Sequence, residues 1–535
     1  MLTRAQTGNL KPRQIFDLEH SVIPTNPTGV TQAVKYSAWR QAMSTEFEAL
    51  QRQGTWLLVP PEPHQNVLGC KWLFKTKFNS NGSIARYKAR LVAQGFKQEH
   101  GLDYYETFSP VAKFATIRVF LTVTVSHKWT LLQLDMSNAF LHGALQEQVF
   151  MKQPAGFVDS QFPHHVCLLK KAIYGLKQSP RQWFETLSSY LLSYGFTTST
   201  ADPSLLIYNR DTTQLYILIY VDDILLTGNS DAAISTLFRA LQTKFKMNNL
   251  GKLNQFLGLQ ATHTAYGIHL NQTHYATEVL HKAAMSDCKP VLTPLPTVLP
   301  SSDSNDQPFE RPEFYRQIVG SLQYLTLTRP DLLFAVHFLC KYMHQPQLLH
   351  FQLLKRVLRY IKGTIQLGLP IRQDSLHLTS FADSDWASDK IDRKSVTGYC
   401  AFLGSTLVSW SVKKQTSVAR SSTEAEYRAV STAACEVIWL RRLLSEFKAL
   451  SPAPTQLYCD NVSALALANN PIFHARTKHI EIDFHFIRDC IRSNQISVHH
   501  ISTIDQPADI FTKSLPAARF VLLRDKLRIQ SPSLP

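Results

Sequence analysis

One stretch of the chain reads Leu215-Tyr-Ile-Leu-Ile-Tyr-Val-Asp-Asp-Ile-Leu-Leu-Thr-Gly228. Its two apolar, β-rich runs predict two short strands, with Asp222 and Asp223 at the turn between them. Asp-Gly or Asn-Gly is the usual pair in such a turn, so an ordinary solvated hairpin explains Asp-Asp poorly. Two carboxylates held this close repel each other, and a hard cation such as Mg²⁺ relieves that repulsion. The hairpin is therefore predicted to form part of a metal site.

A third carboxylate ends another predicted strand. Leu131, Leu132 and Leu134 make a strand-like run that is followed by Asp135. A single Asp at a strand end is usually a helix cap, and Asp135 is compatible with that role. It is also the further ligand that two-metal phosphoryl transfer requires, because two cations need more ligands than one Asp pair supplies.

A basic hairpin is predicted nearer the N-terminus. Residues 69–78 and 84–93 form two strand-like runs, joined by a turn that contains Asn81-Gly82. Alternation along each strand places its cations on one face. These cations are Lys75, Lys77, Arg86, Lys88 and Arg90. A basic face is often simply solvated, but beside a metal site it is a candidate surface for a triphosphate or a template backbone.

A second set of acids lies in the last third of the chain. The residue pattern there predicts the element order β, β, β, α, β, α, α, β, α. Four carboxylates fall at strand ends or in early helical turns: Asp383, Glu426, Asp460 and Asp509, the last at the start of the final helix. One such acid would be a surface residue or a cap, but four on separate elements resemble a second two-metal site.

The amino-acid composition of the chain indicates the kind of partner that it binds and the cellular compartment in which it occurs. The 535-residue chain has a formal net charge of +16, which favours a polyanionic partner, most often nucleic acid. Its eight cysteines are scattered without a Cys-x-x-Cys pair, so neither a disulfide framework nor a zinc site is expected. Neither a secretory signal nor an apolar run of membrane-spanning length is recognisable, so we expect a cytosolic or nuclear protein without a membrane partner.

Several ordered motifs resemble those of copia-type long-terminal-repeat retrotransposons. They are Lys71-Trp72, Arg86–Ala93, Glu106–Val111, Asp135–Gly143, Tyr174–Pro180, Tyr220–Asp223, Ser421–Ala429 and Arg476–Ile480. The first two-thirds of the chain resembles the reverse transcriptase of these elements, and the last third resembles their ribonuclease H domain. The resemblance implies an α/β protein: an α+β polymerase palm with fingers and thumb, followed by a ribonuclease H-like α/β domain.

The resemblance also implies a linear order of parts within the C-terminal portion of a Pol polyprotein. These parts are a flexible leader (1–32), the reverse transcriptase (33–290), a linker and connection (291–375), a ribonuclease H-like domain (376–520) and a tail (521–535). The linker begins with a run rich in Pro, Ser and Asp between residues 290 and 311, a composition typical of irregular connections.

Each acid has a role by resemblance. The implied polymerase ligands are Asp135, Asp222 and Asp223, which would hold two Mg²⁺ (or Mn²⁺) ions that activate the primer 3′-hydroxyl and neutralise the leaving pyrophosphate. The implied nuclease ligands are Asp383, Glu426, Asp460 and Asp509. Glu426 is preferred to Glu424, and Asp385 remains an alternative to Asp383. His499 and His500 lie near the last Asp but have the pattern of strand residues, and they are left out of the catalytic set.

Other residues are expected to bind the deoxynucleoside triphosphate or the template. They are Lys75, Arg86, Lys88, Arg90, Phe140, Gly175, Lys177 and Gln178. By resemblance, Phe140 would stack beneath the incoming sugar and reject a 2′-hydroxyl group. Ordinary core packing is the alternative explanation for this ring. Residues 256–259 resemble a primer-gripping hairpin.

The implied activity is that of an RNA-directed DNA polymerase with ribonuclease H activity. Its expected partners are an RNA template, a DNA or transfer RNA primer and an RNA–DNA hybrid. A dimer and association with other retrotransposon proteins are left open, as are virus-like particles in the cytoplasm and the nucleus as locations. The alternative is an inactive or host-adopted relic that binds nucleic acid without catalysis. An integrase or other nuclease alone would leave residues 1–370 unexplained.

Overall fold

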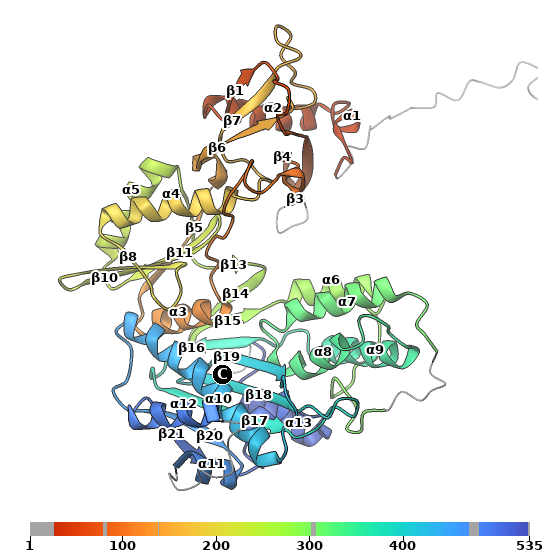
Figure 1. Ribbon diagram of the computed structural model, residues 1–535, viewed down its shortest axis with the longest axis vertical. Helices are drawn as coiled ribbons and strands as arrows, with labels where there is room; N and C mark the ends of the chain where they lie inside the picture. Colours follow the sequence, from red (N-terminus) through yellow and green to blue (C-terminus); the bar gives the residue numbers. More distant parts are fainter. Residues whose placement is uncertain (1–25, 79–82, 137, 301–306, 470–480, 533–535) are drawn as a thin grey trace, which may run out of the picture. The chain divides into compact units, whose positions relative to one another are not determined.

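A computed structural model describes residues 26–78, 83–136, 138–300, 307–469 and 481–532 (Figure 1). The predicted leader up to residue 25, the Asn81-Gly82 turn and the Arg476–Ile480 motif lie outside the described residues. The chain contains helices and sheets throughout, so the predicted mixed α/β class is confirmed. Among the described residues, none of the helices combines the length and the apolar composition that crossing a membrane requires.

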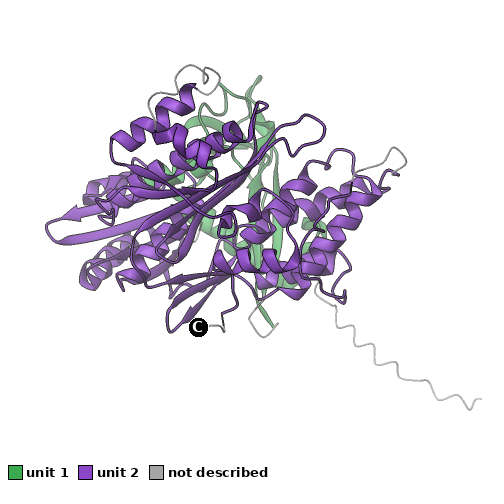
Figure 2. Cartoon of the chain, turned by 90° about the horizontal axis from the view of Figure 1, so that it is seen from below, with its two compact units in different colours: residues 1–109, 138–187 green, residues 110–137, 188–535 purple. Residues whose placement is uncertain are grey.

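The chain divides into two compact units, which are coloured separately in Figure 2. The first unit comprises residues 1–109 and 138–187, and the second comprises residues 110–137 and 188–535. The chain thus passes from the first unit to the second at residue 110 and returns to the first at residue 138. From residue 188 onward it belongs to the second unit. The linear domain boundaries expected from the sequence stay a prediction.

The first unit packs an amphipathic helix against two sheets. Helix α2 (Ser37–Arg52) buries Trp39, whose ring centroid lies 5.3 Å from that of Phe74 and 4.7 Å from that of Tyr87. These two rings belong to the predicted hairpin, now strands β3 (Cys70–Phe78) and β4 (Ile84–Ala93). The other sheet has the order β1-β7-β6-β2, with β1 (Trp56–Val59), β2 (Val67–Leu68), β6 (Ala144–Met151) and β7 (Val166–Lys171). Helix α4 (Ser179–Tyr194) leads into the second unit.

The predicted Tyr220–Asp223 hairpin lies in a six-stranded sheet of the second unit. The sheet order is β12-β5-β11-β10-β9-β8. Its strands are β5 (Thr130–Asp135), β8 (Thr197–Thr198), β9 (Leu205–Arg210), β10 (Thr213–Tyr220), β11 (Asp223–Gly228) and β12 (Asn248–Gly251), with helices α3 (Phe114–Ser126) and α5 (Asp231–Phe245). Strands β10 and β11 are antiparallel and their centres are buried, which confirms the predicted hairpin.

A smaller antiparallel sheet follows, in the order β13-β14-β15-β16. Its strands are β13 (Gln255–Phe256), β14 (Leu259–Thr264), β15 (Gly267–Asn271) and β16 (Leu369–Arg372). Between β15 and β16 the chain forms helices α6 (Thr273–Lys282), α7 (Pro312–Leu325), α8 (Leu333–Cys340) and α9 (Leu348–Gly363). A short 3₁₀ helix, Pro330–Leu332, separates α7 from α8, and Pro346 lies in the segment between α8 and α9. The pairing of β16 with β15, across about a hundred residues of chain, was not part of the prediction.

The last sheet has the order β19-β18-β17-β20-β21. Its strands are β17 (Leu378–Asp385), β18 (Val396–Leu403), β19 (Thr406–Lys414), β20 (Thr455–Cys459) and β21 (Ile496–His500), with helices α10 (Ser422–Glu446), α11 (Val462–Asn469), α12 (Glu481–Arg492) and α13 (Ala517–Lys526). The first three strands are antiparallel, whereas β20 and β21 run parallel to β17. This order confirms the predicted sequence of elements up to β21.

The expectation that Asp509 begins the last α-helix is wrong. Asp509 lies in a short 3₁₀ helix, Pro507–Phe511, and the last α-helix starts only at Ala517. Pro516 explains the interruption, because a proline disfavours helical backbone at the residue before it. Asp509 is therefore held by a tight turn of its own.

One hydrophobic core runs through the second unit. It includes Phe120 of α3, Tyr360 of α9 and Tyr427 of α10, and thus joins all three parts of that unit. A buried arginine crosses the same region: Arg118 of α3 donates hydrogen bonds from Nε to Val408 O (2.7 Å) and from Nη1 to Leu327 O (3.3 Å). The sheet with the β10–β11 hairpin and the last sheet therefore share one packed interior.

Replacing Arg118 by Met should lower the free energy of unfolding by about 2–4 kcal/mol, because two buried carbonyl groups lose their donor. The measurement is equilibrium unfolding in denaturant, followed by tryptophan fluorescence. Arg239→Met is the matched control, since Arg239 is exposed and bonds only within its own helix, and it should change stability by less than about 0.5 kcal/mol. Equal stability of the two variants would contradict the assigned role of Arg118.

Candidate functional site

Three of the predicted acids meet at one end of the six-stranded sheet. Asp135, the last residue of β5, lies directly opposite Asp223, the first residue of β11. Asp222 occupies the adjoining turn, and its backbone carbonyl accepts a hydrogen bond from Met136 N at 3.0 Å. All three carboxylates are partly exposed. We call Asp135, Asp222 and Asp223 the palm cluster.

The turn that carries Asp222 has an unusual backbone. Tyr220 pairs with Asp223, so Val221 and Asp222 alone connect the two strands. Val221 has a φ of +56°, a left-handed conformation that a β-branched residue rarely adopts. Such outliers persist where the surrounding structure imposes them, and they gather at functional sites.

Electrostatics show that the palm cluster is crowded. The pKa of Asp223 is raised to about 6, first by burial and then by the charges of Asp222 and Asp135. All three groups offer only oxygen atoms as ligands, which is the donor chemistry that Mg²⁺ and Mn²⁺ prefer. A bound cation would offset every cause of the raised pKa.

The last sheet brings together all four acids of the second predicted set. Asp383 of β17, Asp460 after β20 and Asp509 each offer a carboxylate oxygen, and these oxygens lie within 4.8 Å of one another. Asp460 also belongs to a neighbouring group with Glu426 of α10 and Cys459, at the same spacing. We call Asp383, Glu426, Asp460 and Asp509 the second cluster.

Burial and neighbouring charges act strongly on this second cluster. Burial raises the pKa of Asp383, which is only 1% exposed, and the Lys513 ammonium opposes that rise. Burial also raises the pKa of Glu426, and the charges of Asp383 and Asp460 add to it. The chain thus concentrates negative charge where water cannot screen it well.

Several partners of the second cluster were not found from the sequence. The Thr512 hydroxyl donates to Asp383, and the Lys513 ammonium lies 2.9 Å from Asp509 and 3.6 Å from Asp383. Arg519 forms an ion pair with Asp509 at 3.1 Å. A sequence signal existed for Thr512 and Lys513, because side chains three and four residues after Asp509 can share its face of a helical turn.

The residues that the sequence analysis ranked lower take other positions. Glu424 accepts a hydrogen bond from Arg420 N (2.8 Å) and forms an ion pair with Arg428 (2.7 Å), near the N-terminus of α10. Asp385 lies two residues beyond Asp383 on β17 and is in neither group of close acids. His499 and His500 lie in strand β21, as predicted, and both are exposed.

The basic residues of the first unit share one face of the β3–β4 hairpin. Lys75 lies opposite Lys88, Lys77 opposite Arg86, and Arg90 opposite Leu73. Like charges directly opposite each other destabilise a strand pair. This arrangement therefore favours an anionic ligand.

The remaining predicted contacts surround Tyr174. The Phe140 ring meets that of Tyr174 edge-on, with centroids 4.8 Å apart, and the Arg90 guanidinium lies 4.2 Å from the centroid of the same Tyr174 ring. Gly175 has a φ of +94°, and a Cβ there would lie 2.2 Å from Ala93 O. Only glycine therefore fits this close approach to β4.

The side chains of Lys177 and Gln178 hold a neighbouring loop. Lys177 Nζ donates to Gln98 O (3.2 Å) and Tyr104 Oη (3.1 Å), and the buried Gln178 amide donates to Asp103 O (2.9 Å). Their expected contacts with a nucleotide stay a prediction. These residues belong to the first unit, whereas both acidic clusters belong to the second.

Comparison with known proteins agrees with these motifs. The family described as "Reverse transcriptase (RNA-dependent DNA polymerase)" matches residues 53–297. The chain is 46% identical over 523 residues to the Retrovirus-related Pol polyprotein from transposon RE2 of Arabidopsis thaliana, covering 97% of this chain and 36% of that polyprotein. It is 31% identical over 308 residues to a transposon Ty5-1 protein of Saccharomyces cerevisiae, covering 57% of this chain and all of that protein.

The chain thus spans about a third of the length of the polyprotein that it matches. Among solved structures, a foamy viral protease-reverse transcriptase in complex with double-stranded DNA is 11% identical, with 90% of this chain and 72% of that chain covered. Its TM-score of 0.23 is too low to carry a structural argument. By its sequence similarity to these relatives, the chain belongs to the copia-type retrotransposon Pol polyproteins and contains their reverse transcriptase region.

Proposed function

We propose that this chain is an RNA-directed DNA polymerase that also cleaves the RNA strand of an RNA–DNA hybrid. The observation that carries the proposal is the direct pairing of Asp135 with Asp223, with Asp222 in the adjoining turn. Membership of the reverse transcriptase family supports the same activity. The template would be RNA, and the primer would be DNA or a transfer RNA.

In polymerisation, the palm cluster would hold divalent cations. The three partly exposed carboxylates fit Mg²⁺ or Mn²⁺, because they offer hard oxygen ligands and repel one another without a cation. When bound, the ions would polarise the primer 3′-hydroxyl and neutralise charge on the leaving pyrophosphate. The basic face of β3 and β4 would bind phosphates of the deoxynucleoside triphosphate or of the template.

In hybrid cleavage, the second cluster would play the corresponding part. Four carboxylates, two of them with pKa values raised by burial, fit divalent cations that would activate a water molecule for attack on the RNA phosphodiester. Lys513 holds Asp383 and Asp509 in place through its ion pairs. Selection of RNA over DNA would depend on contacts to the 2′-hydroxyl group.

The alternative function is a relic that binds nucleic acid without catalysis. It shares the basic strand face but needs no carboxylate at any of the seven positions. The close approach of four buried or half-buried acids in the second cluster favours the enzyme, because Lys513 and Arg519 offset only part of its charge and a divalent cation would offset the rest.

Two substitutions should separate the activities. Asp222→Asn should lower Mg²⁺-dependent primer extension on an RNA template by roughly 10²-fold or more and leave hybrid cleavage intact. Asp460→Asn should do the reverse. Controls are Asp211→Asn and Asp489→Asn, both at exposed positions outside the clusters, and both should retain both activities. Loss of both activities in each cluster variant, with the fold intact, would contradict two separate sites.

The crowding of the palm cluster predicts a pH effect on the metal-free protein. Because the pKa of Asp223 is raised to about 6, the folded chain binds its proton more tightly than the unfolded chain does. The free energy of unfolding should therefore fall as pH rises from about 4 to about 6. Above that range, Asp223→Asn should be more stable than the natural chain by about 1 kcal/mol, a value reduced for the partial exposure of the group.

Thermal unfolding in a chelator at pH 4 and pH 7 measures this difference. At pH 4 the difference should be much smaller than at pH 7, because Asp223 is then still protonated in the folded chain and about half protonated in the unfolded chain. Added Mg²⁺ should stabilise the natural chain more than the variant. A variant that is less stable than the natural chain in chelator at pH 7 would refute the assigned repulsion.

The expected sugar filter can be tested at Phe140. Phe140→Val should lower the preference for deoxynucleotides, measured as the ratio of kcat/KM for a deoxynucleotide to kcat/KM for the matching ribonucleotide, by about 10-fold or more. Phe162→Val, at an exposed ring of the same unit, is the control. If the ratio stays constant while activity is retained, Phe140 only packs against Tyr174.

A further inference from the structure

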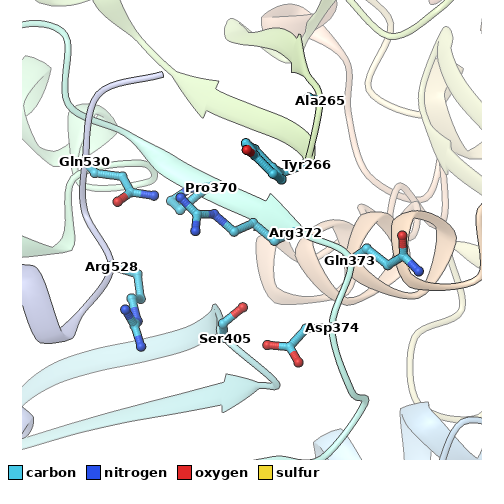
Figure 3. Close-up of a pocket in the computed structure, with 9 residues that line it drawn as sticks. All are labelled: Ala265, Tyr266, Pro370, Arg372, Gln373, Asp374, Ser405, Arg528 and Gln530. Carbon is cyan, nitrogen blue, oxygen red and sulfur yellow. The ribbon is translucent and has the colours of Figure 1, made fainter. Parts of the chain in front are cut away.

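A surface cavity of 530 Å³ lies in the second unit, apart from every residue of the two clusters (Figure 3). Four segments that are distant in sequence line it: the β14–β15 turn, the end of β16 with the residues after it, the β18–β19 turn, and the segment after α13. No function has been assigned above to any of these segments. We call this cavity the arginine groove.

Backbone hydrogen bonds fix the walls of the arginine groove. Gly267 of β15 lies opposite Arg372 of β16, and a Cβ at Gly267 would lie 2.1 Å from Ile371 O, so glycine permits this close pairing. On the other side, Gln530 and Gly368 exchange two backbone hydrogen bonds, at 3.0 and 3.1 Å. In addition, His269 Nε2 lies 2.8 Å from Gln530 O, which is within hydrogen-bond distance. The groove is thus preformed.

The charge of the groove is positive. Arg372 and Arg528 both line it, and within the described part of the chain neither has an ion-pair partner. Asp374 is the one acid in the lining. Its carboxylate accepts a hydrogen bond from the Ser405 side chain and another from the Ser375 backbone N–H at 2.6 Å, and these bonds lower its pKa. The Asp374 carboxylate is therefore already bound by Ser375 and Ser405, while both guanidinium groups remain available to an anion.

The groove also offers a stacking face. Tyr266 is 59% exposed, and its ring stands over the cavity, close to Pro370 and to the side chain of Arg372 (Figure 3). The amide of Gln530 lies at the same rim (Figure 3). An exposed aromatic ring beside unpaired arginines is the combination on which nucleobases stack while the cations bind phosphate. An acidic peptide would form ion pairs with the two arginines, but it would leave the Tyr266 ring without a stacking partner.

We propose that the arginine groove binds a nucleotide of a nucleic-acid strand, with its phosphate on Arg372 and Arg528 and its base or sugar against Tyr266. Guanidinium groups bind phosphate oxygens in a planar, paired geometry, which favours this ligand over a simple carboxylate. The groove would add a contact with nucleic acid outside both clusters. The inference does not require either cluster to be catalytic.

The test measures equilibrium binding of fluorescent single-stranded and RNA–DNA hybrid oligonucleotides in chelator over a range of salt concentrations. The doubly substituted chain, Arg372→Gln with Arg528→Gln, should bind more weakly. Its slope of log K against log salt should be shallower by about 1, since the loss of one phosphate contact removes nearly one counterion. Arg210→Gln, at an exposed arginine of β9, is the matched control and should leave the slope unchanged.

Two further variants separate charge from stacking and from misfolding. Arg372→Lys with Arg528→Lys keeps both charges and should restore the slope. Tyr266→Ala should weaken single-strand binding by about 5-fold or more without changing the slope, because it removes only the stacking face. Thermal unfolding of each variant confirms that the fold is retained.

Titration with a deoxynucleoside monophosphate and with inorganic phosphate identifies the source of the phosphate. One possible result is that the natural chain binds the monophosphate and the double Gln variant does not, while the two chains give the same salt slope for oligonucleotides. In that case the arginine groove is a binding site whose ligand is a free nucleotide. The proposal is overturned if the double Gln variant matches the natural chain in slope, in affinity and in monophosphate binding. Because the chelator prevents turnover, a failure of the proposed activities would not alter this result.

Discussion

Repulsion between carboxylates that the backbone forces together is the constraint on which the rest of the protein depends. The register of β5 against β11 places Asp135 opposite Asp223, and no rotation of a side chain can undo that pairing. Burial first, and then the charges of Asp222 and Asp135, raise the pKa of Asp223. The strands can hold this arrangement because their buried centres, from Leu215 to Ile219 and from Ile224 to Leu226, supply the apolar burial that offsets it.

The same principle recurs in the last sheet with different elements. Here Asp383, Asp460 and Asp509 come from a strand, a strand end and a short 3₁₀ helix. Lys513 partly compensates the charge of this group, whereas the described residues that act most on Asp223 are two further acids, Asp222 and Asp135. Since α3, α9 and α10 contribute to one core, both acidic clusters belong to one continuously packed unit.

Much of this organisation could be predicted from local sequence. The apolar, β-rich runs on either side of Asp222 and Asp223 predict the hairpin, because this signal acts over a few residues. The positions of the acids at strand ends suggested that they converge, but only as a hypothesis. The two-unit division, the pairing of β15 with β16 and the burial of Arg118 were not predictable, because each depends on contacts between segments far apart in sequence. The start of the last helix at Ala517 was missed although Pro516 signals it.

Iron-mediated cleavage of the backbone maps bound metal on the chain itself. Fe²⁺ replaces Mg²⁺, and the hydroxyl radicals that it generates cut the backbone next to each occupied site. The account predicts cuts near residues 135 and 222–223 from one site, and near residues 383, 426, 460 and 509 from the other. Asp222→Asn should remove only the first set. Cuts that are absent from either set, or that disappear together in this variant, would contradict two independent metal sites built by two separate sheets.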